Sequence, residues 1–87
     1  MNDAFLAAFH ALPLGAFTGR AHCRRYRVMR RTYAQGRSHE LVAHELGGSD
    51  YISMNLYDLQ SGARLKPCEM PEAKVRDFVL ALVPEKD

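Results

Sequence analysis

The chain has 87 residues, a formal net charge of +2 and a hydrophobic content of 47%. This length suits one domain spanning residues 1–87, and the composition excludes a disordered chain. No apolar run is long enough for a membrane span, and His10 interrupts the apolar N-terminal stretch, so we expect neither a membrane helix nor a signal peptide. We therefore predict a cytoplasmic protein with reduced cysteines.

The first predicted element is a short amphipathic helix over residues 2–12. Asn2 or Asp3 is a candidate N-cap, and Pro13 with Gly15 ends the helix. The apolar residues at helical spacing are Phe5, Leu6, Phe9 and Leu12.

From Phe17 onward, turn residues recur every 12–14 positions, at 35–36, 47–50 and 61–62. This spacing is typical of an antiparallel meander. The predicted strands cover residues 17–22, 25–34, 40–46, 51–57 and 64–70. The join between the first two strands contains no glycine, and Pro67 indicates that the last strand lies at a sheet edge.

Strict period-two alternation predicts the two faces of strand 51–57. Ile52, Met54 and Leu56 would face the core, and the residues facing outward would be Tyr51, Ser53, Asn55 and Tyr57. In strand 25–34, Tyr26 and Val28 fit the core face. The outward set would be Arg25, Arg27, Met29, Arg31 and Tyr33. Arg30 breaks this alternation and indicates a β-bulge.

A second helix is predicted over residues 71–83, with Pro71 at its first helical position and Pro84 after its end. Its apolar stripe consists of Val75, Phe78, Val79 and Leu82. The predicted fold is therefore α+β: an antiparallel β-meander of four to five strands, with an N-terminal helix and with a C-terminal helix packed on one sheet face.

Charge is distributed unevenly along the chain. Seven arginines and no acidic residue fall between Gly19 and Ser38, whereas residues 40–87 contain nine acidic and five basic residues, a net charge of −4. Such polarity favours an anionic partner.

An open sheet face that carries tyrosines beside arginines has the composition of a platform for single-stranded DNA or RNA, because bases stack on aromatic rings and arginines neutralise phosphates. The predicted contact residues are Arg25, Arg27, Arg31, Tyr33, Tyr51 and Tyr57. Two alternatives use the same arginines. They can pair with Glu40, Glu45 and Asp58 on neighbouring strands, or they can bind an acidic protein or a second copy of the chain.

Catalytic signatures are not recognisable in the sequence. His39 and His44 are five residues apart, so on a strand they point to opposite faces and cannot share a metal ion without a bulge. Cys68 precedes a helix, but Glu69 beside it opposes activation of the thiol. We therefore predict a binding protein without enzymatic activity, metal or small-molecule cofactor.

Two family resemblances can be stated. The chain resembles short uncharacterised bacterial proteins of this length at Gly36-Arg37-Ser38 and at residues 45–48, 51–57 and 65–71, which implies no function. Part of the chain is also similar to the C-terminal half of the single-stranded-DNA-binding transcriptional coactivator family called positive cofactor four. The residues that carry this similarity are the segment 51–57, Ser61-Gly62, Leu65-Lys66-Pro67 and Pro71-Glu72. That second resemblance implies a curved four-stranded sheet that grips unpaired DNA, and a helix through which two copies dimerise.

Overall fold

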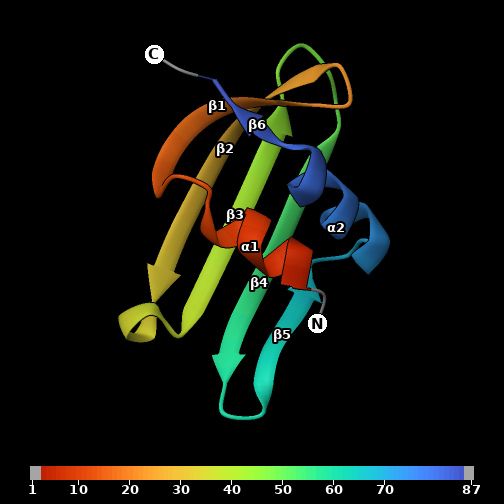
Figure 1. Cartoon of the computed structure of the whole chain (residues 1–87). Helices are drawn as coiled ribbons and strands as arrows, with labels where there is room; N and C mark the ends of the chain where they lie inside the picture. The colour runs from red at the N-terminus through yellow and green to blue at the C-terminus, as the bar shows by residue number, and fades with distance from the viewer. Residues whose placement is uncertain (1–2, 86–87) are drawn as a thin grey trace.

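The computed structural model describes residues 3–85 and confirms the α+β class (Figure 1). The six antiparallel strands exceed the predicted four or five. The elements in chain order are α1 (Asp3–His10), β1 (Gly15–Ala21), β2 (Arg24–Tyr33), the 3-10 turn η1 (Ala34–Gly36), β3 (Ser38–Glu45), β4 (Tyr51–Leu59), β5 (Gly62–Pro67), α2 (Glu72–Ala81) and β6 (Val83–Pro84).

The sheet has the order β5-β4-β3-β2-β1-β6, so the first five strands form the predicted meander. The sequence pattern missed β6, which pairs with the outer side of β1 through Gly19↔Pro84 and Arg20↔Val83. Glycine at position 19 permits this approach, because a Cβ there would lie 2.7 Å from Leu82 Cδ1. Leu82 already has an extended backbone, which is why the helix ends before the predicted residue 83.

Other boundaries shift by a few residues. Pro71 is the N-cap of α2 rather than its first helical residue, because its ψ of 144° is extended. β5 ends at Pro67 and lies at the sheet edge, as that proline predicted. α1 is shorter than predicted, and capping by Asn2 lies outside the described residues.

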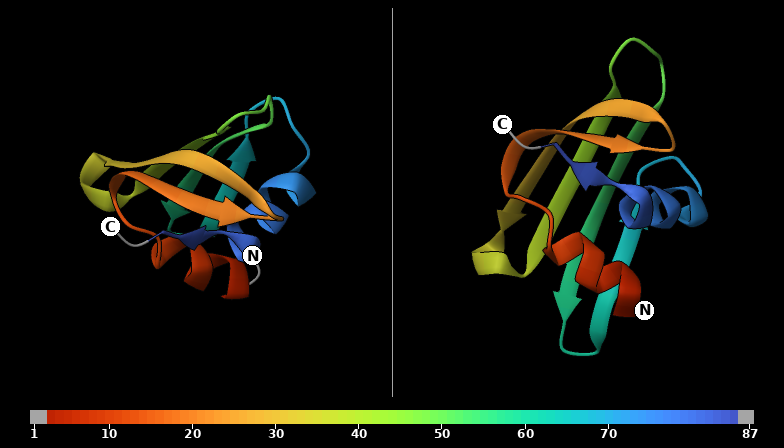
Figure 2. Two further views of the ribbon diagram at one scale, coloured as in Figure 1. Left: turned by 90° about the horizontal axis from the view of Figure 1, so that it is seen from above. Right: turned by 45° about the horizontal axis from the view of Figure 1, so that its top comes forward.

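One face of the sheet contributes to a single hydrophobic cluster with both helices. Figures 1 and 2 draw α1 and α2 on the same side of the curved sheet, and the two helices contact each other. The predicted inward residues of β2 and β4 are buried, as is the apolar stripe of α2. The buried members from β2, β4, α2 and the C-cap of α2 are Tyr26, Val28, Ile52, Met54, Leu56, Val75, Phe78, Val79 and Leu82.

The prediction of a β-bulge at Arg30 is wrong. β2 pairs without interruption through Gly15↔Arg30 and Arg30↔Leu41, so the arginine keeps the strand alternation and points to the core face. It is only 6% exposed. Its Nη1 donates to the carbonyl of Leu12 over 2.6 Å, and its guanidinium lies 4.8 Å from the ring centroid of Phe9. A polar residue is tolerated here because it satisfies the backbone that follows α1.

Within residues 3–85, no helix combines the length and the apolar character that crossing a bilayer requires.

The join between β1 and β2 is a two-residue turn in which both His22 (φ 52°) and Cys23 (φ 64°) are left-handed. Positive φ at both positions is the signature of a type I′ hairpin turn, which normally contains glycine or asparagine. The sequence therefore gave no signal for this turn.

We expect Cys23→Gly to stabilise the protein by about 0.5–1 kcal/mol, because glycine removes the steric cost of a left-handed backbone. Cys23 is exposed, so no packing is lost, and His22 keeps its contact with Asp77. Chemical denaturation measures the change, with Cys23→Ala as the control that retains Cβ. A destabilised glycine variant would contradict this account of the turn.

Candidate functional site

The sheet face opposite the hydrophobic cluster is called the open face. The register places the six predicted contact residues on this face. Arg27 lies opposite His44, which lies opposite Tyr51 on the next strand. Tyr33 lies opposite Ser38, which lies opposite Tyr57. Directly paired residues share a face, and residues two apart on one strand do so as well. The full predicted set on this face is Arg25, Arg27, Arg31, Tyr33, Tyr51 and Tyr57.

A shallow hollow of about 330 Å³ lies on the open face over β2 and β3. Arg27 and Arg31 contribute its basic groups, and Glu40 contributes a carboxylate. Met29 and Val42 form part of its floor and are only partly buried. The hollow therefore offers an apolar floor between cations, a combination that suits a flat ring attached to an anion.

Arg25 is the least available of the predicted arginines. Its Nε and Nη2 each donate to a carboxylate oxygen of Glu85 over 2.9 Å, and Arg20 Nε lies 3.3 Å from the same carboxylate. These hydrogen bonds lower the pKa of Glu85, with Arg25 as the main cause. The alternative of cross-strand pairing named Glu40, Glu45 and Asp58, but the carboxylate that holds Arg25 comes from beyond β6.

Arg27 and Arg31 differ from Arg25 because neither forms a salt bridge with any residue from 3 to 85. Arg31 lies opposite Glu40 in the register without an ion pair between them. Glu40 instead accepts a 3.3 Å hydrogen bond from the Tyr33 hydroxyl. Arg27 Nη1 makes only a long contact of 3.4 Å to the Thr18 hydroxyl. Both arginines are exposed, so their charges are available to an anion from solution.

Two basic residues of β5, both on the open face, were not among the predicted site residues. Arg64 lies opposite Tyr57, and Lys66 lies opposite Asn55, which puts both side chains on the open face beside β4. Both are exposed, and Leu65 between them is buried. The alternation of Arg64, Leu65 and Lys66 is the sequence signal that indicates this orientation.

The tyrosines differ in their surroundings. Tyr51 is 41% exposed, and the Nζ of Lys74 lies 5.8 Å from its ring centroid. Tyr33 is 49% exposed at the end of β2. Tyr57 is partly buried on β4. An exposed phenol ring on an open sheet face can stack against a second planar ring.

A second hollow, of about 260 Å³, lies between the sheet and α2. Asp50 there accepts 2.8 Å hydrogen bonds from the Tyr26 hydroxyl and from Lys74 Nζ. The Nε2 of His22 lies 3.0 Å from a carboxylate oxygen of Asp77. Because these polar groups satisfy one another, the hollow is better explained as the attachment of α2 to the sheet than as a ligand site.

The structure places His39 and His44 on opposite faces, as their spacing predicted: His39 is 5% exposed beside the Phe9 ring, and His44 lines the open-face hollow. Cys23 and Cys68 are both free thiols. Comparisons with family models, with curated proteins and with solved structures find no match for this chain. The two family resemblances therefore remain predictions.

Proposed function

We propose that this chain is a small non-enzymatic binding protein whose open face contacts single-stranded nucleic acid. In this proposal both helices pack on the other face and leave the open face for the ligand. The observation that carries the proposal is the location of Arg27 and Arg31, which form no salt bridge with any described residue, on the same face as three tyrosines. A neutral partner would give these charges no counterpart.

The arrangement suits a flexible polyanion. Arg27 and Arg31 would contact phosphates at the hollow, and Tyr51 and Tyr57 would stack against bases. These tyrosines are six positions apart on β4, which corresponds to about 20 Å at the usual rise of a strand. Each ring would therefore meet a different base. Arg64 and Lys66 would extend the basic track beyond β4, since backbone neutralisation supplies most of the affinity for single strands.

The test is fluorescence anisotropy of a labelled mixed-sequence single strand of about 20 nucleotides, titrated with protein at two salt concentrations. We expect a log–log salt slope near −2 to −3, which corresponds to roughly three to four phosphate contacts. The variant Arg27→Gln/Arg31→Gln should bind about tenfold more weakly and have a slope shallower by about 1.4, because two phosphate contacts are lost.

A matched control removes the same charge from the other side of the molecule. Arg24→Gln/Arg76→Gln alters a residue that contacts Glu45 and a residue of α2, and it should retain most of the binding. Equal losses in the two double variants would mean that only net charge matters. No binding at micromolar protein and low salt would overturn the proposal. A salt-sensitive dimer in sedimentation would then favour the acidic partner or the second copy.

A further inference from the structure

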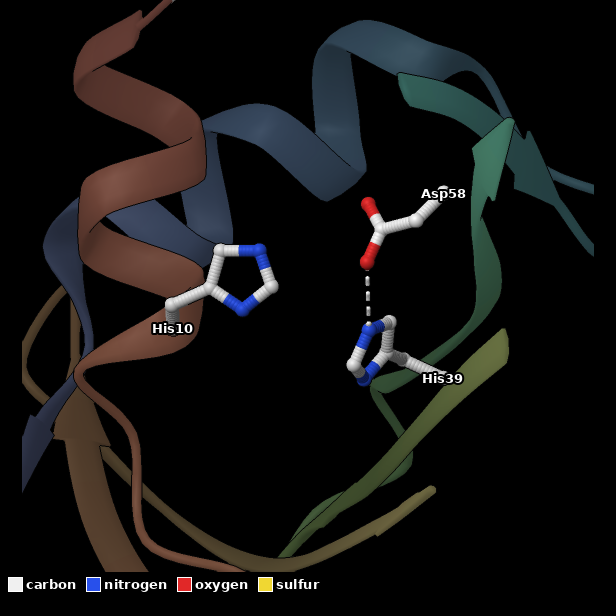
Figure 3. A group of neighbouring side chains, drawn as sticks. All are labelled: His10, His39 and Asp58. Carbon is white, nitrogen blue, oxygen red and sulfur yellow. Dashed lines mark hydrogen bonds and ion pairs between the residues drawn. The ribbon is translucent and has the colours of Figure 1, made fainter. Parts of the chain in front are cut away.

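A group of potential metal ligands lies under α1, on the side of the sheet opposite the open face. One ligand atom each from His10, His39 and Asp58 lies within 4.8 Å of the other two. Figure 3 shows the two imidazole rings and the carboxylate gathered between α1 and the sheet. The three residues come from three elements, α1, β3 and β4, and their positions in sequence are far from any recognised ligand spacing.

We propose that His10, His39 and Asp58 form a binding site for a divalent transition metal ion of the zinc class. Two imidazoles and one carboxylate are donors of the type that such ions accept, and three protein ligands leave a coordination position for water. The proposal is independent of nucleic-acid binding, because none of these residues lies on the open face.

His39 provides the fixed part of the site. Its position follows from the pairing of β3 with β2 and β4, and it is only 5% exposed. Its ring packs edge-on against Phe9 at 5.6 Å and against His10 at 5.3 Å. Its Nε2 lies 3.1 Å from a carboxylate oxygen of Asp58. The site thus has one ligand locked by packing, which is the usual requirement for a preorganised metal centre.

The second imidazole distinguishes this cluster from a simple ion pair. The Nε2 of His39 faces Asp58 and is the nitrogen that would bind an ion, whereas the buried Nδ1 lies on the other side of the ring and has no hydrogen-bond partner. Among the described residues, the ring of His10 has aromatic neighbours in Phe9 and His39 but no hydrogen bond to its nitrogens. The His39–Asp58 pair does not engage the nitrogens of His10, so His10 stays available as a further ligand of an ion.

The remaining two ligands are accessible and adjustable. His10 is exposed and the Asp58 side chain is 42% exposed, so an ion can enter from solvent. Tetrahedral coordination at zinc distances needs ligand atoms about 3.3 Å apart. Rotation of the exposed His10 and Asp58 side chains can supply the difference. The bound ion would tie α1 to the centre of the sheet.

The experiment titrates the whole protein with Zn²⁺ by calorimetry at pH 7.5 and with Co²⁺ by visible absorption. We expect one ion per chain, a four- or five-coordinate Co²⁺ spectrum, and a thermal transition that rises with metal concentration. His10→Ala and Asp58→Asn alter accessible side chains, so the fold should persist, and each should weaken binding at least tenfold.

His44→Ala and Asp77→Asn are the matched controls, because each changes the same residue type at an exposed position outside the cluster. They should bind Zn²⁺ as the wild type does. No stoichiometric binding by the wild type would overturn the proposal. Binding that survives in both His10→Ala and Asp58→Asn, or that disappears in His44→Ala, would overturn it as well.

Discussion

Replacing Arg30 by alanine should reduce the free energy of unfolding by about 2–4 kcal/mol, one of the largest effects of any arginine substitution in this chain. The carbonyl of Leu12 would lose the donor that lies 2.6 Å away, and the Phe9 ring would lose the guanidinium packed 4.8 Å from its centroid. The arginine stem would also leave a cavity in a buried site. Urea denaturation followed by circular dichroism measures the change.

Two further variants separate packing from hydrogen bonding. Burial lowers the pKa of Arg30, but a guanidinium remains charged at neutral pH, so the protein bears a desolvation cost, and no carboxylate among the described residues pairs with this arginine. Arg30→Met fills most of the volume and removes that cost, so it should destabilise by only about 1–2 kcal/mol, from the unpaired carbonyl. Arg31→Ala, at the exposed neighbouring position, should change stability by less than about 0.5 kcal/mol. A loss below about 1 kcal/mol in Arg30→Ala would contradict the structural role.

The sequence predicted the elements whose pattern is local. The alternation of residues 51–57 and the stripe at Val75, Phe78, Val79 and Leu82 each follow from one element burying one side, and both are buried as expected. The same logic placed Tyr26 and Val28 inward. Prediction worked where hydrophobic periodicity alone determines which side is buried.

Prediction from the sequence failed where a contact joins distant parts of the chain. In the sequence Arg30 interrupts the hydrophobic alternation, because its partner is the carbonyl of Leu12 in the segment after α1. The 60-residue separation of Arg25 from Glu85 has no local signature. β6 contains two residues and exists only because the chain after α2 passes beside β1. Such contacts depend on tertiary arrangement, which single-strand patterns do not encode.

The candidate sites divide in the same way. The open face follows from strand alternation, so its arginines and tyrosines could be predicted from the sequence, although Arg64 and Lys66 were missed. The cluster of His10, His39 and Asp58 could not, because it needs α1 to pack over the paired strands β3 and β4. Histidine spacing within a strand excluded His39 with His44 but gave no information about His10.

Replacing Asp50 by alanine should destabilise the protein by about 2–3 kcal/mol. Most of this loss comes from the Tyr26 hydroxyl, which is buried and would lose its acceptor at 2.8 Å. The remainder comes from Lys74, which fixes α2 to the same carboxylate at 2.8 Å. Chemical denaturation of the wild type, Asp50→Ala, Tyr26→Phe and the double variant gives a double-mutant cycle.

The cycle should show coupling of about 1–2 kcal/mol, because in Tyr26→Phe no buried hydroxyl remains to be left unpaired. Independent, additive effects would contradict a direct Tyr26–Asp50 interaction. A second cycle with Lys74→Gln in place of Tyr26→Phe serves as the comparison. This cycle should show weaker coupling, because the Lys74–Asp50 pair is more exposed to solvent.

The pH dependence of the free energy of unfolding gives a second measurement of the contribution of Asp50. The hydrogen bond from Lys74, followed by that from Tyr26, lowers the pKa of Asp50 below its ordinary value. A carboxyl with a depressed folded-state pKa contributes stability that is complete above the unfolded value of about 3.9 and is lost as the pH falls towards the folded value. The stability difference between the wild type and Asp50→Ala should therefore be constant from pH 7 to about 5 and shrink below about 4. A difference that stays constant through this acid range would mean that the Asp50 carboxylate does not favour the folded state.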